Sequence, residues 1–195
     1  MSAKETRGMI FREITIRDIP ALFDVRTSVR ENASTHSGLY SAGITENAVE
    51  AMLRTSHRAW LCECGAKVVG FAMGNRETGE FWVIAVLPEF EGRGIGSKLL
   101  NLAESWLWAT GWKEIWLWTS LDTQLRAYSF YKKHGWFDAE VRTNQRIMKK
   151  SNLPLSQGDQ ASGQVESWAG EIPPRQAQWL AEWVRSKAKT GVGPR

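Results

Sequence analysis

Residues 80–100 read EFWVIAVLPEFEGRGIGSKLL, and this stretch decides the expected fold. An apolar pattern that predicts a strand ends at Pro88 and is followed by three alternate glycines: Gly92, Gly94 and Gly96. The next apolar residues recur at helical spacing and predict a helix over 95–110. A glycine turn at a helix N-terminus is suited to an anion such as a pyrophosphate, because the first helix amides lack partners and the helix dipole adds positive potential.

The order of residues in this turn excludes two common phosphate-binding motifs. A P-loop has Lys followed by Ser or Thr after its second glycine, whereas here Ser97 precedes Lys98. The dinucleotide fingerprint Gly-x-Gly-x-x-Gly requires a third glycine where this chain has Ser97 or Leu99. The turn alone therefore predicts anion binding in general, and a purely structural role for its glycines stays open.

Helix and strand patterns on both sides of this stretch predict an α+β protein. In chain order, the expected elements are a strand over 10–16, a helix from Pro20 to about Arg30, a loop over 31–43, a helix opened by Thr45, strands over 59–64, 68–75 and 80–87, the long helix, a strand over 114–119, a helix from Asp122 or Thr123 to about Lys133, and one or two strands over 141–150. Short turns that contain glycine join the three middle strands, which is typical of an antiparallel meander.

The composition of the chain changes after Lys150. Residues 151–172 are rich in Ser, Gln and Gly, which predicts a linker. Residues 173–195 begin with two prolines and predict an amphipathic helix with one apolar stripe: Trp179, Leu180, Trp183 and Val184. We therefore expect a domain over 1–150 and a C-terminal helix that docks on this domain, on a partner or on a second subunit; the last arrangement would make a homodimer.

The overall composition is that of a soluble globular protein, with 43% hydrophobic and 24% charged residues. The net charge of +4 is not gathered in a basic patch, so we expect no nucleic-acid partner. No apolar stretch is long enough to span a bilayer and the N-terminus lacks a signal peptide, so we expect a cytoplasmic protein without membrane contact. The only cysteines, Cys62 and Cys64, have no Cys or His cluster near them, so we expect no metal.

Two segments at compatible spacing together resemble the GNAT superfamily of N-acetyltransferases. The family's cofactor motif is Gln or Arg, two residues, Gly, one residue, then Gly or Ala, and it is matched from Glu91 to Gly96 with Glu91 at the Gln or Arg position. A second segment resembles the family pattern Asn-x-x-Ala-x-x-Phe-Tyr followed by Gly-Phe, at Gln124, Ala127, Phe130, Tyr131, Gly135 and Trp136. The resemblance covers roughly residues 10–150 and implies a central mixed, mainly antiparallel sheet flanked by helices.

The resemblance also implies a cofactor site and a reaction. Acetyl-coenzyme A would lie between the third meander strand and the strand after the long helix, on these residues: Ala85, Val86, Leu87, Glu91, Gly92, Arg93, Gly94, Ile95, Gly96, Ser97, Gln124, Ala127 and Tyr131. An acceptor amine would attack the thioester directly, and Tyr131 would protonate the departing thiolate. Glu80 stands where several family members have a catalytic glutamate, although a solvated strand-end charge and a base acting through ordered water stay open.

The acceptor is expected near the first helices and their loop, with Arg26, Arg30 and Asn32 as the first candidates to bind it. Trp82 and Trp118 can close the cleft, although core packing is the more common role of tryptophan. The acceptor would be the primary amine of a small molecule or a peptide, and the sequence does not distinguish between them. The alternative function is a non-catalytic coenzyme A-binding or regulatory module.

Overall fold

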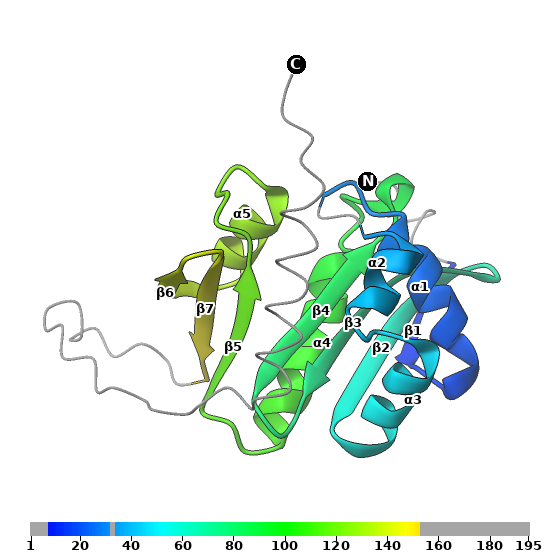
Figure 1. Ribbon diagram of the computed structural model, residues 1–195, viewed down its shortest axis with the longest axis horizontal. Coiled ribbons are helices and arrows are strands. Elements are labelled where there is room, and N and C mark those ends of the chain that lie inside the picture. Colours follow the sequence, from blue (N-terminus) through cyan, green and yellow to red (C-terminus); the bar gives the residue numbers. More distant parts are fainter. Residues whose placement is uncertain (1–7, 32–33, 153–195) are drawn as a thin grey trace, which may run out of the picture.

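The computed structural model describes residues 8–31 and 34–152, which form a seven-stranded sheet with helices on both faces (Figure 1). The strands are β1 (Met9–Glu13), β2 (His57–Cys64), β3 (Lys67–Asn75), β4 (Glu80–Val86), β5 (Glu114–Thr119), β6 (Phe137–Arg142) and β7 (Gln145–Ser151). The helices are α1 (Ile19–Thr27), α2 (His36–Ser41), α3 (Glu46–Thr55), α4 (Ile95–Ala109) and α5 (Arg126–Lys133), with 3₁₀ turns at Ile16–Asp18 and Pro88–Phe90.

The sheet is mixed, because one pair of neighbouring strands is parallel. The strand order is β1-β2-β3-β4-β5-β7-β6; β4 pairs with β5 in parallel, and the other neighbours are antiparallel. The predicted meander of β2, β3 and β4 and the predicted α+β architecture are therefore confirmed. β4 and β5 pair at one position, Glu80 with Trp116, and then diverge (Figure 1). This divergence opens the sheet near its centre.

Helices cover both faces of the meander, and its central strand is apolar on both sides as a result. α1, α2 and α3 lie on one face and α4 lies on the other (Figure 1). A Cβ placed on Gly74 of β3 would lie 3.3 Å from the Leu107 side chain of α4. Phe71, three residues earlier in the same strand, lines a cavity together with Leu22 of α1. The nearly continuous burial along β3 follows from this two-sided packing.

A buried carboxylate joins the two halves of the divided sheet. Glu104 of α4 is 4% exposed and accepts hydrogen bonds from Trp136 Nε1 (2.7 Å) and Lys150 Nζ (2.6 Å). Trp136 follows α5 and Lys150 lies in β7, whereas α4 packs mainly against β2, β3 and β4. Glu104 therefore ties the β5–β7–β6 half to the helix that covers the meander, and the domain stays in one piece although its central strands separate.

The expected loop over 31–43 contains the short helix α2, so this part of the prediction is wrong. Thr35 caps the helix, because its hydroxyl accepts a hydrogen bond from the Gly38 amide (3.0 Å). Leu39 is the buried residue that holds the helix against the core. A helix of six residues is too short to display a helical period, so the sequence pattern did not reveal it.

Several element ends also differ from the predicted ones; α1, for example, ends at Thr27 and not near Arg30. α5 begins at Arg126, later than expected, and neither Asp122 nor Thr123 caps it. Asp122 Oδ1 instead accepts a hydrogen bond from the Gln124 amide (2.9 Å) in a turn before the helix. The first strand ends at Glu13, since the residues after it lead into a 3₁₀ turn. The strands expected over 141–150 form the hairpin β6–β7, which begins earlier, at Phe137.

The C-terminal predictions concern residues that the structure leaves mostly undescribed. The expected linker over 151–172 is described only to residue 152, and the expected helix over 173–195 lies wholly outside the described residues. Within the described part of the chain, no helix has the length and apolarity needed to cross a membrane.

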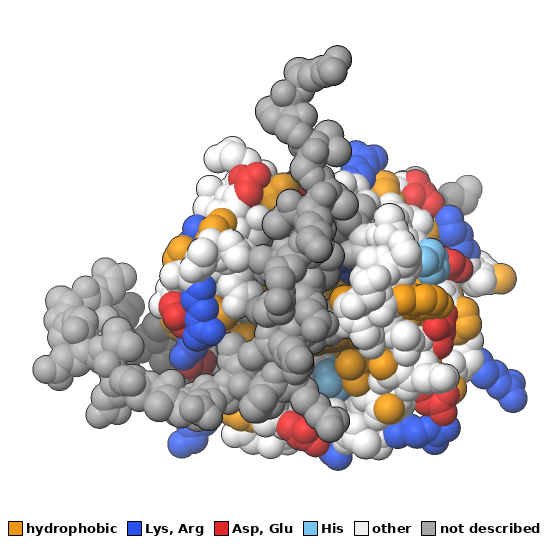
Figure 2. All heavy atoms as spheres, viewed as in Figure 1, with side chains coloured by type: hydrophobic (Ala, Val, Ile, Leu, Met, Phe, Trp, Pro, Cys, Tyr) orange, Lys and Arg blue, Asp and Glu red, His pale blue; other side chains and the backbone are white. Residues whose placement is uncertain are grey.

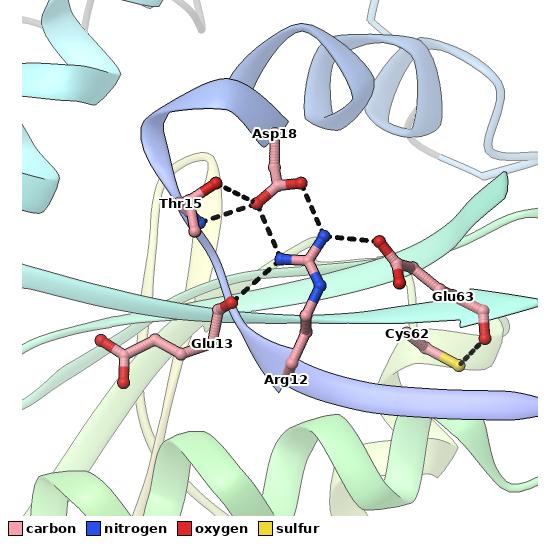
Figure 3. Close-up of polar contacts among 6 residues, drawn as sticks. All are labelled: Arg12, Glu13, Thr15, Asp18, Cys62 and Glu63. Carbon is pink, nitrogen blue, oxygen red and sulfur yellow. Dashed lines mark hydrogen bonds and ion pairs between the residues drawn. The ribbon is translucent and has the colours of Figure 1, made fainter. Parts of the chain in front are cut away.

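An arginine fork fixes β1 to the turn that leads into α1 (Figure 3). The Arg12 guanidinium donates to both Asp18 oxygens (2.8 and 2.7 Å) and to Glu63 Oε1 of β2 (2.5 Å). Asp18 also accepts from the Thr15 amide (2.7 Å) and hydroxyl (2.8 Å). Hydrogen bonds from Arg12 are the main reason that the pKa of Asp18 is held well below its usual range. This ion pair joins β1 and β2 to the 3₁₀ turn from which α1 starts.

Candidate active site

A cleft of about 1070 Å³ occupies the opening between β4 and β5. Its walls come from β4, β5, the glycine turn, α4, α5 and the end of α1. Most of the cofactor residues implied by the resemblance line it: Ala85, Val86, Glu91, Gly92, Gly94, Ile95, Gly96, Ser97, Ala127 and Tyr131. The strand separation therefore brings into one cleft residues that are far apart in the sequence.

The glycine turn has the backbone conformation that the sequence indicates. Gly92 and Gly94 have φ angles of 73° and 80°, in the left-handed region where a side chain is strained. Gly94 is the N-cap residue of α4 and has no side chain to cap the helix. The first hydrogen bond of the helix runs from the Lys98 amide to the Gly94 carbonyl (3.1 Å). The amides of Ile95, Gly96 and Ser97 are therefore left for an anion, as helix geometry requires.

The hydroxyl of Ser97 is held by His134, which sequence reasoning missed. His134 Nδ1 lies 2.8 Å from the Phe130 carbonyl, an acceptor, so this ring nitrogen carries the proton. In the neutral ring, Nε2 is then an acceptor and receives the Ser97 hydroxyl at 2.9 Å. The bond connects the first turn of α4 to the end of α5 and fixes the orientation of Ser97 beside the cleft.

Arg126 explains how the turn accommodates Glu91 at the Gln or Arg position. The Arg126 guanidinium forms an ion pair with the Glu91 carboxylate, and the Arg126 amide donates to Glu31 Oε2 (2.9 Å). Both carboxylates at this part of the cleft are thus paired with the start of α5, which lessens their repulsion of an anion. Sequence reasoning missed Arg126, because it follows Glu91 by 35 positions and no local pattern connects the two residues.

Tyr131 lines the cleft from α5 and is 8% exposed. Its ring packs against Phe81 of β4 at 6.3 Å between centroids and against Phe130 at 5.5 Å. Burial raises the pKa of the Tyr131 phenol, so the group stays protonated at neutral pH. A protonated phenol in an apolar wall is a hydrogen-bond donor available to a group bound in the cleft.

Glu80 is buried at the closed end of the opening, where β4 and β5 still pair. It is 4% exposed, so the alternative of a solvated strand-end charge is wrong. Burial raises the pKa of Glu80 to about 7, and a hydrogen bond from Trp118 lowers it in part. The carboxyl does not itself line the cleft, whereas Trp118 does. Glu80 thus lies one side chain away from the cleft and titrates near neutral pH.

A bulge in β4 directs two consecutive residues toward the same side. Met73 of β3 pairs with Val83 and Gly74 pairs with Phe81, so Trp82 is an extra residue in the ladder. As a result Trp82 and Val83 both line the main cleft and also a smaller cavity on the α1 side of the sheet. Trp82 and Trp118 therefore form part of the cleft wall; the sequence alone did not decide between this role and core packing.

The remaining candidates lie at the edge of the cleft or away from it. Arg26 and Arg30 line the cleft, and Asn32 lies outside the described residues. Leu87 is buried in the core, and the guanidinium of Arg93 lies over the Phe90 ring at 5.1 Å. Gln124 is an exposed residue of the turn before α5. Leu87, Arg93 and Gln124 are not among the described residues that line the cleft.

A divided mixed sheet with a glycine turn at a helix N-terminus and a buried tyrosine at the opening is the arrangement to compare with known proteins. Residues 21–136 match the acetyltransferase (GNAT) family, and the chain belongs to this family. An uncharacterized N-acetyltransferase of Methanocaldococcus jannaschii is 33% identical over 99 residues, which are 46% of this chain and 43% of that relative. The match to this curated relative therefore spans less than half of the relative's length.

Solved structures have the same fold at low sequence identity. PaiA N-acetyltransferase from Thermoplasma acidophilum, in complex with coenzyme A, superimposes with a TM-score of 0.63 at 18% identity, covering 73% of this chain and 98% of that chain. The ribosomal-protein-S18-alanine N-acetyltransferase of Escherichia coli gives a TM-score of 0.59 at 17% identity, covering 77% and 97%. These likenesses show the GNAT fold; they extend over nearly the whole of each solved structure and over 73% and 77% of this chain.

Replacement of Gly94 by Val tests the anion-binding turn. The φ of 80° is strained for a β-branched residue, so the turn should rearrange and the three amides should lose their common direction. We expect coenzyme A affinity, measured by isothermal titration calorimetry, to fall by about tenfold or more. Gly65→Val is the matched control, because Gly65 also has a positive φ (62°) but lies in the β2–β3 turn. Equal losses of affinity in both variants would contradict the assignment.

Proposed function

We propose that the chain transfers an acetyl group from acetyl-coenzyme A to the primary amine of a small molecule or peptide, by direct attack of the amine on the thioester. The observation that carries the proposal is the cleft between β4 and β5, which contains both the first amides of α4, which have no partner within the helix, and the buried phenol of Tyr131. Membership of the GNAT family supports it, and so does the coenzyme A bound in the PaiA structure.

Two parts of the cleft fit acetyl-coenzyme A: the N-terminus of α4 and the open edge of β4. The amides of Ile95, Gly96 and Ser97 would hold the pyrophosphate, since they meet it at the positive end of the helix dipole. Beyond Glu80, the edge of β4 that faces β5 has no strand partner among the described residues. Its backbone can pair with the amide groups of the pantetheine arm like an added strand. When bound, acetyl-coenzyme A supplies the thioester carbonyl that the amine attacks.

Tyr131 would act as the general acid. The acetyl group can leave coenzyme A only if the sulfur can depart, and a donor to the sulfur makes that departure easier. The phenol stays protonated because burial raises its pKa, and it lines the same cleft as the glycine turn. The ring contacts with Phe81 and Phe130 hold it in one orientation, which positions the hydroxyl before the reaction begins.

Glu80 would act as the general base through water. An amine that is protonated in solution must lose a proton before it can attack, and a base with a pKa near the working pH is suited to accept it. Burial brings the pKa of Glu80 to about 7. Because Glu80 does not line the cleft, the proton would reach its carboxyl through water beside Trp118.

Replacement of Tyr131 by Phe separates catalysis from binding. We expect kcat to fall by about 100-fold or more while the Kd for coenzyme A changes less than twofold, because only the proton donor is removed. Thiol release with acetyl-coenzyme A measures the rate, and calorimetry measures the Kd. Tyr128→Phe is the control on the same helix, since the Tyr128 hydroxyl donates to Asp138 (2.8 Å) and does not line the cleft.

Unchanged turnover in Tyr131→Phe would remove the acid role. Tight coenzyme A binding by the unaltered chain, with no acetylation of any amine in a broad panel, would instead favour a non-catalytic coenzyme A-binding module.

Replacement of Glu80 by Gln tests its role as the general base through the pH dependence of kcat/KM. The carboxyl must be ionised to accept a proton, so kcat/KM of the unaltered chain should rise with pH through about 7. In Glu80→Gln we expect kcat/KM to fall by about 100-fold and this rise to disappear. Glu77→Gln, an exposed carboxylate three residues before Glu80, should keep the rise. A Glu80→Gln profile that keeps the rise near pH 7 would assign it to another group.

A further inference from the structure

The smaller cavity on the α1 side of the sheet indicates which amines the cleft accepts. We propose that the acceptor has, beside its amino group, an apolar group of about four carbons, and that this group enters the cavity. The proposal rests on the proposed acetyl transfer and deepens it. Four features carry it: the walls of the cavity, its opening, its size and the charges around it.

The walls of the cavity are almost wholly apolar. They come from α1, α2, α3 and the central strands, for example Leu22, Leu39, Val49 and Met73, and Arg26 is the one charged residue among the lining side chains. In the view of Figure 2, hydrophobic side chains gather over the region of these helices. Apart from Arg26 and the two tryptophans, Trp82 and Trp118, the described residues of these walls carry no hydrogen-bonding side chain, so an apolar group is the one that gains most by leaving water.

The cavity adjoins the main cleft beside Arg26, one of the residues expected to bind the acceptor. Four residues line both: Arg26, Trp82, Val83 and Trp118. The bulge at Trp82 is what lets consecutive β4 residues face both spaces. Trp82 is held edge-on by His57 at 5.5 Å between ring centroids. An acceptor can therefore keep its amino group in the cleft while its side group enters the cavity.

The size of the cavity limits the side group. Its volume is about 110 Å³. A cavity of roughly 150 Å³ holds benzene, so this one suits an apolar group of about four non-hydrogen atoms, as in the side chains of leucine and methionine, and is too small for an indole. Each missing carbon leaves part of the apolar wall uncovered and weakens binding of the transition state.

The charges at this end of the cleft disfavour a polyamine. Arg26 and Arg30 are the basic residues here, and they would repel a second ammonium group. The carboxylates that line the cleft, Glu31 and Glu91, are both engaged by Arg126. Among the described residues, no carboxylate lines the smaller cavity. The site therefore suits a single amine beside an apolar group.

A panel of amines tests the proposal on the full chain with acetyl-coenzyme A and thiol release. The panel is glycinamide, alaninamide, leucinamide, methioninamide, tryptophanamide and spermidine, with free leucine and a short leucine-initiated peptide to distinguish a metabolite from a peptide. We expect kcat/KM for leucinamide or methioninamide to exceed that for alaninamide by about tenfold and that for tryptophanamide by more. Equal rates across the amides, or spermidine as the best acceptor, would overturn the proposal. No thiol release with any amine, despite coenzyme A binding, would overturn the proposed function as well.

Two cavity variants test the location in opposite directions. Val49→Phe fills the cavity, and the leucinamide-to-alaninamide ratio of kcat/KM should fall toward one. Leu39→Ala enlarges it, and phenylalaninamide should gain about tenfold relative to leucinamide. Leu53→Phe is the control, because Leu53 lies on α3 with Val49 but does not line the cavity. If Val49→Phe does not fold, Leu39→Ala decides the matter; a variant that folds and leaves these ratios unchanged would overturn the proposal.

Discussion

The separation of β4 from β5 is the constraint on which the site depends. The two strands pair at Glu80 and Trp116 and then part, which leaves backbone groups of β4 without a strand partner and opens a cleft between the halves of the sheet. An open sheet edge inside a domain is costly unless something satisfies its polar groups. Glu104 connects the two halves through Trp136 and Lys150 although their central strands separate.

The same constraint connects the proposed chemistry with the proposed specificity. At the closed end of the opening, burial places the pKa of Glu80 near neutrality, whereas the glycine turn and Tyr131 lie along the wider part. The bulge at Trp82 adds an exit from the cleft toward the α1 side, where the walls become apolar. The glycine turn, the cleft and the smaller cavity are thus the regions proposed to hold the pyrophosphate, the thioester and amine, and the apolar group of the acceptor.

The sequence predicted the elements whose signals are local and missed the contacts that join distant segments. The meander, the glycine turn and the long α4 were readable, because strand alternation, positive-φ glycines and helical spacing are short-range patterns. α2 was too short to show a period. The pairing of Arg126 with Glu91, the link from His134 to Ser97 and the cavity behind Trp82 depend on how α5 and the bulged β4 pack, which no spacing in the chain encodes.

Residue-resolved amide hydrogen exchange by NMR tests the central claim most directly, with coenzyme A compared to pantetheine, which lacks the pyrophosphate. The open edge of β4 and the partnerless amides of α4 should respond differently to the two ligands. We expect both ligands to slow exchange along β4 from Val83 to Val86, and coenzyme A alone to slow it at Ile95, Gly96 and Ser97. Unchanged exchange at these amides with saturating coenzyme A would contradict a cleft built around the separated strands.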